Sequence, residues 1–294
     1  MEIFGIPHQA FLGQLMLGLV NGAFYAMLSL GLAVIFGLLD IVNFAHGALY
    51  MLGAFAAWIM LDKFEINFWF ALVLAPLIVG ALGVAIERGF LKHLYGLDPL
   101  YGLLLTFGLS LIFEGLLREQ YGVSGQSYPV PELLSGATNL GFMVLPNYRA
   151  FVVVASLLVC LGTWFLIERT RLGAYLRAGT ENAKLVQAFG VNVPLMVMLT
   201  YGAGAALAAL AGVLAAPIIQ VTPLMGSNLI IVVFAVVVIG GMGSILGSVV
   251  TGLGLGIIEG MTRVFYAEAS SVVVFVVMVL VLIVRPAGLF GKEA

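Results

Sequence analysis

A series of long apolar runs constrains the fold of this chain more than any other feature. Several of them exceed the roughly 18 to 20 residues that a helix needs to span a lipid bilayer. Hydrophobic residues make up 63% of the 294 and charged residues only 9%, whereas soluble domains carry roughly 25% charged residues. So few charges cannot cover a folded surface of this size in water, which excludes a soluble globular enzyme. Because the runs are continuous rather than alternating, a β-barrel is also disfavoured. We therefore predict an all-α, polytopic membrane helix bundle.

Nine apolar segments are candidate spans within a single transmembrane domain covering residues 1–294. They occupy residues 11–38, 41–61, 68–86, 99–117, 149–167, 195–219, 229–239, 244–260 and 272–284. Segment 229–239 is too short to cross comfortably and ends in Gly-Gly-Met-Gly-Ser, which favours a broken or re-entrant segment buried in protein. Because the shorter segments are ambiguous, about eight to ten spans are expected. The first residues lack the positive region of a signal peptide, so the first run is expected to be retained.

Two ladders of small residues recur at every fourth position. The first holds Gly204, Ala208, Gly212 and Ala216, and the second holds Ser244, Ser248, Gly252, Gly256 and Gly260. Small residues at this spacing let another helix approach closely. We therefore predict helix packing at both ladders; the same pattern would also permit helices to slide or tilt.

Polar residues between the first two apolar runs form a candidate translocation path. Asp40, Asn43 and His46 follow one another at steps of three and would share one side of a helix. Ionisable groups within spans are costly and often mark a pathway. The alternative is that Asp40 or Asn43 caps the next helix while His46 packs against a carbonyl. The candidate path comprises Asn43 and His46 together with the glycines of the later break, Gly240, Gly241 and Gly243.

Two other carboxylates lie near the ends of apolar segments. Glu114 precedes Arg118, and Glu259 precedes Arg263, by four residues. On a helix such residues are neighbours, so each pair is predicted to form an ion pair.

Residues 168–194 form the only long polar run between strongly apolar segments. The run contains four of the twelve lysines and arginines. From Thr180 to Phe189 the pattern predicts a short amphipathic helix, stopped by Gly190 with positive φ. Ala183, Val186 and Phe189 would share one side. Because so short a helix is rarely stable alone in water, it must pack against the lipid surface, its own chain or a cytoplasmic partner.

The distribution of positive charge assigns sides to the loops. Arg88 with Lys92, the run 168–194, and Arg285 with Lys292 are predicted to be cytoplasmic. The polar loop between Arg118 and Arg149 alternates with them and falls outside. The side of the N-terminus remains undecided at this stage.

Motifs for catalysis are missing from the sequence. It contains no P-loop, so hydrolysis of nucleotide is not expected, and no HExxH or GxSxG motif. The single cysteine, Cys160, allows neither a disulfide nor a cysteine-based metal site within the chain. A membrane permease is therefore favoured over an intramembrane enzyme.

Several stretches in order along the chain resemble the permeases of branched-chain amino-acid ABC importers, of the LivH type. They are VNGAFYAMLSLGLAVIFGLLDIVNFAHGALYMLGAF, RTRLGAYLRAGTENAKLVQAFGVN, AALAGVLAAP and VVVIGGMGSILGSVVTGLGLGIIEG. The resemblance implies a multi-pass protein of the bacterial inner membrane. It also implies a second similar permease, identical or not, two cytoplasmic ATPases that bind ATP and Mg, and a periplasmic binding protein. No cofactor in this chain and no nucleic-acid partner are expected.

The resemblance further implies that the run 168–194 touches an ATPase. The implied docking residues are Thr180, Glu181, Ala183, Lys184, Gln187 and Gly190. Relative to the Glu-Ala-Ala…Gly loop of ABC importers at large, Asn182 replaces the first alanine and the spacing to Gly190 is longer.

Two alternatives stay open at the level of sequence. Relatives of this type are associated with urea, amides and aromatic acids as well as branched-chain amino acids, and the binding protein supplies most of the selectivity. From another class, an ion-coupled secondary transporter or channel would place charged residues in mid-span, where only Asp40, His46, Glu114 and Glu259 are candidates.

Overall fold

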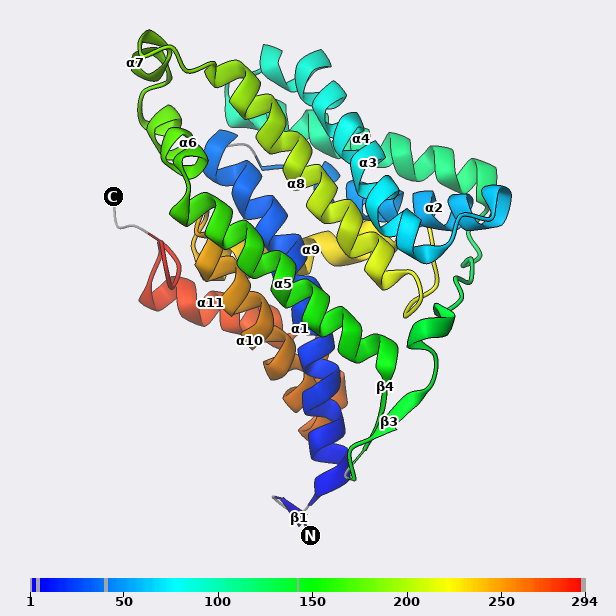
Figure 1. Cartoon of the computed structure of the whole chain (residues 1–294). Coiled ribbons are helices and arrows are strands. Elements are labelled where there is room, and N and C mark those ends of the chain that lie inside the picture. The colour runs from blue at the N-terminus through cyan, green and yellow to red at the C-terminus, as the bar shows by residue number, and fades with distance from the viewer. Residues whose placement is uncertain (1, 4–5, 40–41, 142, 292–294) are drawn as a thin grey trace.

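The computed structural model describes residues 2–3, 6–39, 42–141 and 143–291 (Figure 1). Within these residues, the nine long helices are α1 (His8–Leu39), α2 (Ala45–Phe64), α3 (Phe68–Gly89), α4 (Pro99–Tyr121), α5 (Asn147–Arg169), α8 (Val193–Ala215), α9 (Met225–Gly240), α10 (Ile245–Phe265) and α11 (Val273–Val284). Two shorter helices, α6 (Arg171–Glu181) and α7 (Ala183–Ala188), occupy the polar run. Seven of the long helices are long and apolar enough to cross a membrane, while α9 and α11 are shorter apolar helices. The prediction of an all-α polytopic bundle is confirmed.

Helices α1, α2, α8 and α10 pack closely because small residues face one another. A β-carbon on Gly252 would lie 2.5 Å from the backbone nitrogen of Ala26 in α1, and one on Gly256 would collide with Gly22. In α8, a β-carbon on Gly204 would lie 2.6 Å from the Ile35 side chain of α1. Further along α8, one on Gly212 would collide with the backbone of α2, and Ala208 is fully buried. Each ladder therefore lies against a neighbouring helix backbone.

The peripheral helices expose wide apolar faces. On α4, Leu104, Leu111 and Leu116 are each more than half exposed, and α5 exposes Leu158 and Leu161 similarly. In a bilayer such faces meet lipid or another membrane subunit, because neither requires polar side chains.

The break between α9 and α10 is closed by the end of the chain. Gly241 and Gly243 have φ of 97° and 81°, backbone conformations that residues other than glycine rarely adopt. The amide of Leu289 donates to Ile239 O at 2.8 Å, and that of Phe290 donates to Gly240 O at 3.2 Å. These bonds satisfy carbonyls that the helix end leaves without intrahelical partners.

The polar loop after α4 is packed rather than free. Three short helices of the 3-10 type lie in connectors of the described chain: η1 (Leu91–His93), η2 (Glu132–Leu134) and η3 (Ala267–Ser271). After η2, β3 (Ala137–Asn139) pairs antiparallel with β4 (Val144–Pro146). A second pair of short strands, β1 (Glu2–Ile3) and β2 (Ile6–Pro7), precedes α1. Gln126 and Val221 exchange backbone hydrogen bonds of 2.9 Å, which fastens the loop to the link between α8 and α9.

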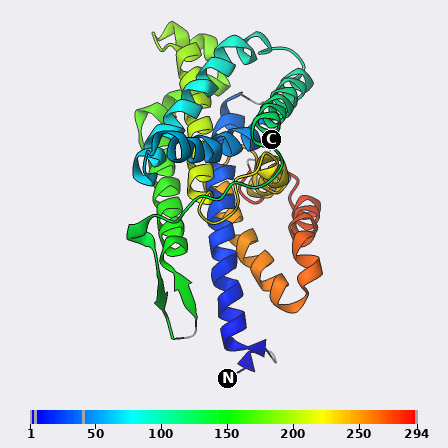
Figure 2. The same cartoon turned by 90° about the vertical axis from the view of Figure 1, so that its right-hand side faces the viewer.

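The two ends of the bundle carry different elements. The N-terminus and the β3–β4 hairpin lie at one end, called the hairpin end, whereas α7 and the α3–α4 connector (residues 90–98) lie at the other, the α7 end (Figures 1 and 2). The sequence left the position of the N-terminus open; the fold places it opposite α7.

Candidate functional site

The polar run folds into two helices instead of the single helix predicted over residues 180–189. Thr180 and Glu181 end α6, and Asn182, with φ −151° and ψ 88°, breaks the helix. Its side-chain oxygen then accepts a hydrogen bond of 3.0 Å from Leu185 N and caps α7. Asparagine favours such caps because its short side chain competes for backbone donors. Gly190 follows with φ 84°, as predicted, in open space.

Helix α6 is anchored to the end of α5. The Arg177 guanidinium donates to Ile167 O at 3.1 Å and to the Glu168 carboxylate at 3.3 Å. Thr180 borders a small cavity of about 90 Å³ together with Gly37 of α1 and Gly243 of the α9–α10 break. Helix α6 therefore packs against α1 and faces the glycine break across this cavity.

Helix α7 presents apolar side chains outward at a polar end of the bundle. Val186 is buried, whereas Leu185 is 55% and Phe189 80% exposed. The expectation that Val186 and Phe189 share one side is therefore wrong, because the helix ends at Ala188 and Phe189 turns away. Glu181, Ala183, Lys184 and Gln187 are all exposed.

The predicted path residues Asn43 and His46 lie at a break between α1 and α2. Asp40 falls outside the described residues. The Thr106 hydroxyl of α4 accepts from Phe44 N at 3.1 Å, and its one proton lies within reach of both Leu103 O (3.1 Å) and Val42 O (3.3 Å). The Thr106 side chain thus provides an acceptor for Phe44 N, a backbone group at the break between α1 and α2.

His46 and Asn43 have different surroundings. His46 Nε2 lies 3.0 Å from Leu28 O, and since a carbonyl only accepts, Nε2 carries the proton. The alternative in which His46 packs on a carbonyl is therefore correct. The Asn43 side chain does not cap α2, whose N-cap residue is Phe44. It is buried beside the Tyr201 hydroxyl of α8 without reaching hydrogen-bond geometry.

The remaining path residues, Gly240, Gly241 and Gly243, have other neighbours. Gly240 lies against Gly247 of α10, Gly241 against the C-terminal tail, and Gly243 against Gly37. Asn43 and His46 therefore lie at the start of α2, whereas the three glycines of the predicted path lie at the break between α9 and α10.

Both predicted ion pairs are present, and each carboxylate also accepts from a second helix. Glu114 lies 3.5 Å from Arg118 and accepts from the Ser227 hydroxyl of α9 at 2.6 Å. Glu259 lies 2.7 Å from Arg263 and accepts from the Tyr25 hydroxyl of α1 at 2.7 Å. The cross-helix partners come from distant positions, so no local spacing could reveal them.

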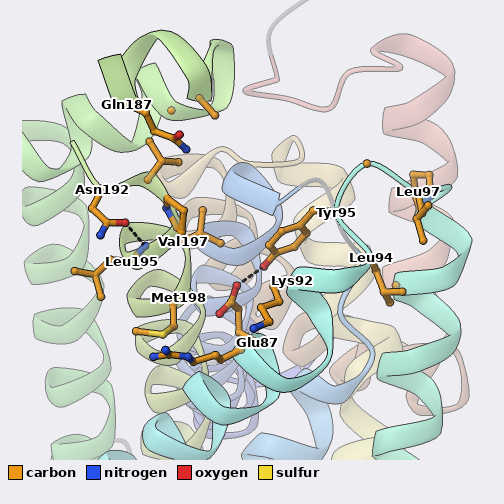
Figure 3. Close-up of a pocket in the computed structure, with 18 of the residues that line it drawn as sticks. Glu87, Lys92, Leu94, Tyr95, Leu97, Gln187, Asn192, Leu195, Val197 and Met198 are labelled. Carbon is orange, nitrogen blue, oxygen red and sulfur yellow. Dashed lines mark hydrogen bonds between the residues drawn. The ribbon is translucent and has the colours of Figure 1, made fainter. Parts of the chain in front are cut away.

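A cavity of about 810 Å³, which the sequence did not predict, opens at the α7 end (Figure 3). One wall is the end of α3 with the connector 90–98; the other is α7 with the start of α8. Glu87 is only 4% exposed, and the Tyr95 hydroxyl donates to its Oε1 at 2.9 Å. Burial, and then this carboxylate, raises the pKa of Tyr95, so the phenol stays protonated at physiological pH. Ala183 and Gln187 of the predicted docking set line the same cavity.

The described part of the chain contains no candidate metal site. Within the described ranges, no three histidine, cysteine, aspartate or glutamate residues lie close enough to hold a metal ion. Cys160 is free and buried in α5.

A bundle of long apolar helices with broken segments, joined at one end by exposed amphipathic helices, defines a multi-pass membrane protein. The family model described as "Branched-chain amino acid transport system / permease component" matches residues 14–282, and the chain belongs to this family. It is 32% identical to the high-affinity branched-chain amino acid transport system permease protein BraD of Pseudomonas aeruginosa, over 96% of both chains. It is 30% identical to LivH of Escherichia coli K12, also over 96% of both.

A second type of permease is also similar. LivM of Escherichia coli K12 is 27% identical over 90% of this chain and 67% of its own length. No solved structure shows significant similarity to the chain.

Proposed function

We propose that the chain is the membrane permease subunit of an ATP-driven ABC importer. It would pass branched-chain amino acids, or related small polar solutes, from a periplasmic binding protein to the cytoplasm across the bacterial inner membrane. The family match over residues 14–282 carries this proposal. The sequence has no P-loop, so the energy must come from separate ATPase subunits that bind ATP and Mg.

The partners follow from the same reasoning. Two ATPases would bind at the α7 end, and the binding protein would dock at the hairpin end. A second permease would pack against the exposed membrane helices. Similarity to both LivH and LivM is compatible with a pair of related, non-identical permeases.

The exposed side chains of Leu185 in α7 and of Phe189 directly after it support ATPase docking at this end. Leu185 and Phe189 expose large apolar surfaces where no hydrocarbon is expected to cover them. Burying such a side chain contributes about 1.5–3 kcal/mol. Helix α6, fastened to the end of α5 and packed against α1, would carry movement of the ATPase into the spans.

The test combines Leu185→Ser and Phe189→Ser in the reconstituted complex. Because a few central apolar residues dominate interfaces, we expect ATPase affinity to fall about tenfold or more. Substrate-stimulated hydrolysis and uptake should fall with it, while membrane insertion stays normal. Leu133→Ser is the matched control for ATPase affinity alone, since Leu133 is 81% exposed and lies in η2, far along the chain from α7. If the double variant retains ATPase binding and uptake, α7 is a connector and the docking proposal fails.

A further inference from the structure

We infer that the cavity at the α7 end is a binding site for a small zwitterion with an apolar side chain, through which the transported amino acid slows its own import. The identity of the ligand rests on the proposed function. The site itself rests on the buried charge, the mixed polarity of the lining and the position of the cavity beside α7.

The cavity contains a buried carboxylate suited to an ammonium group. Glu87 is 4% exposed, and within the described part of the chain its carboxylate has one hydrogen bond, which Oε1 accepts from Tyr95. A buried charge is costly unless it is paired. An ammonium group entering the cavity would supply the missing partner and form a charge-assisted hydrogen bond.

Cations on the same wall suit a carboxylate. Arg88 and Lys92 both line the cavity and neither forms an ion pair within the described residues. Lys92 lies on the same side of the cavity as Glu87 and Tyr95, while Gln187, Asn192 and Leu195 lie across from them (Figure 3). A ligand carrying both charges is therefore matched better than a simple cation or anion.

Apolar residues complete the lining and favour an aliphatic side chain. They are Leu94, Leu97, Val193, Pro194, Leu195, Val197 and Met198. The volume of about 810 Å³ lies within the roughly 300–1,000 Å³ typical of small-molecule sites. A free aliphatic amino acid thus meets a complementary group on each side.

The two walls of the cavity belong to different elements, so a bound ligand would connect them. Ala183 and Gln187 belong to α7, whereas Glu87 and Lys92 belong to α3 and the connector. A ligand that touches both walls favours the arrangement in which they are close. Occupied from the cytoplasm, the site would hold α7 in place and oppose the movement that transport requires.

The experiment uses the complete complex in proteoliposomes, with binding protein and leucine enclosed and ATP outside. Leucine added outside then reaches only the α7 end, and we expect it to lower ATP hydrolysis in a saturable manner. Glu87→Gln should raise the leucine concentration for half inhibition about tenfold or more, because a charge-assisted bond is lost. Glu114→Gln, at a carboxylate of α4 that does not line the cavity, should leave this concentration unchanged.

Direct binding to the purified permease tests the site independently of the ATPase. By calorimetry, leucine should bind the wild type more tightly than leucinamide, which lacks the carboxylate, or 4-methylpentanoate, which lacks the ammonium group. Tyr95→Phe should retain binding and so show that the cavity tolerates substitution. Absence of leucine binding in the wild type, or equal binding by Glu87→Gln, would overturn the inference while leaving the importer proposal intact.

Phosphatidylethanolamine also carries an ammonium group and an anion, so lipid is the competing source of this chemistry. The calorimetry is therefore repeated in nanodiscs of phosphatidylglycerol alone and of phosphatidylglycerol with phosphatidylethanolamine. Equal leucine affinity in both supports a site for the free amino acid. Loss of leucine binding in phosphatidylethanolamine assigns the cavity to a lipid headgroup and overturns the inference.

Discussion

At the scale of single residues, buried polar groups bond to partners that helical spacing does not predict. Glu87 meets Tyr95 across a turn, Glu114 meets Ser227 of another helix, and His46 meets a carbonyl of α1. The sequence flagged the ionisable residues correctly as costly within a membrane but could not name these acceptors and donors. Glu87 could not be predicted as part of a site, because its partner Tyr95 lies eight residues away and matches no helical spacing.

Tyr95→Phe tests the bond to Glu87 in the folded protein. Tyr95 is 37% exposed, so we expect a loss of only about 1 kcal/mol, seen as a lower apparent Tm in detergent. The raised pKa keeps the phenol protonated in the fold, and in the unfolded chain it is protonated below about pH 10. The effect should therefore be the same from about pH 6 to 9. A loss that disappears within that range would contradict this assignment.

At the scale of helices, glycine controls how closely the backbones approach. The second ladder runs along the side of α10 that faces α1, where Gly256 and Gly22 leave no room for a β-carbon on either helix. Gly254, on the same helix, has nothing within 4 Å of the position of a β-carbon. The two positions therefore separate a packing requirement from an intrinsic preference of the helix.

Gly256→Leu should destabilise the permease, by about 1–3 kcal/mol or more, because α1 must move away. Gly254→Leu introduces the same side chain on the same helix and should be tolerated. Yield after membrane extraction and the apparent Tm of the purified protein measure both. Similar behaviour of the two variants would show that α10 does not need this contact.

At the scale of the whole molecule, the bundle has two distinct ends. Placing α7 in the cytoplasm, as positive charge suggests, puts the N-terminus and the β3–β4 hairpin outside, because both lie opposite α7. The proposed import direction therefore runs from the hairpin end to the α7 end.

Single cysteines test this orientation in a Cys160→Ser background. In sealed inverted vesicles, a membrane-impermeant maleimide should label Thr180→Cys and leave Ser135→Cys and His8→Cys unlabelled; intact spheroplasts should give the reverse. Labelling of Ser135→Cys and Thr180→Cys from the same side would refute the topology. Native Cys160, 1% exposed within α5, should react only after unfolding.

The sequence by itself determined where the membrane helices lie, and tertiary structure decided how they meet. In hydrocarbon every backbone group needs an internal partner, so each long apolar run must become a helix, and the observed spans follow the predicted runs closely. Glycine spacing likewise indicated close packing. Local patterns do not encode contacts between distant segments. Hence only the fold could show the position of the N-terminus, the tail that closes the Gly240–Gly243 break, and the cavity around Glu87.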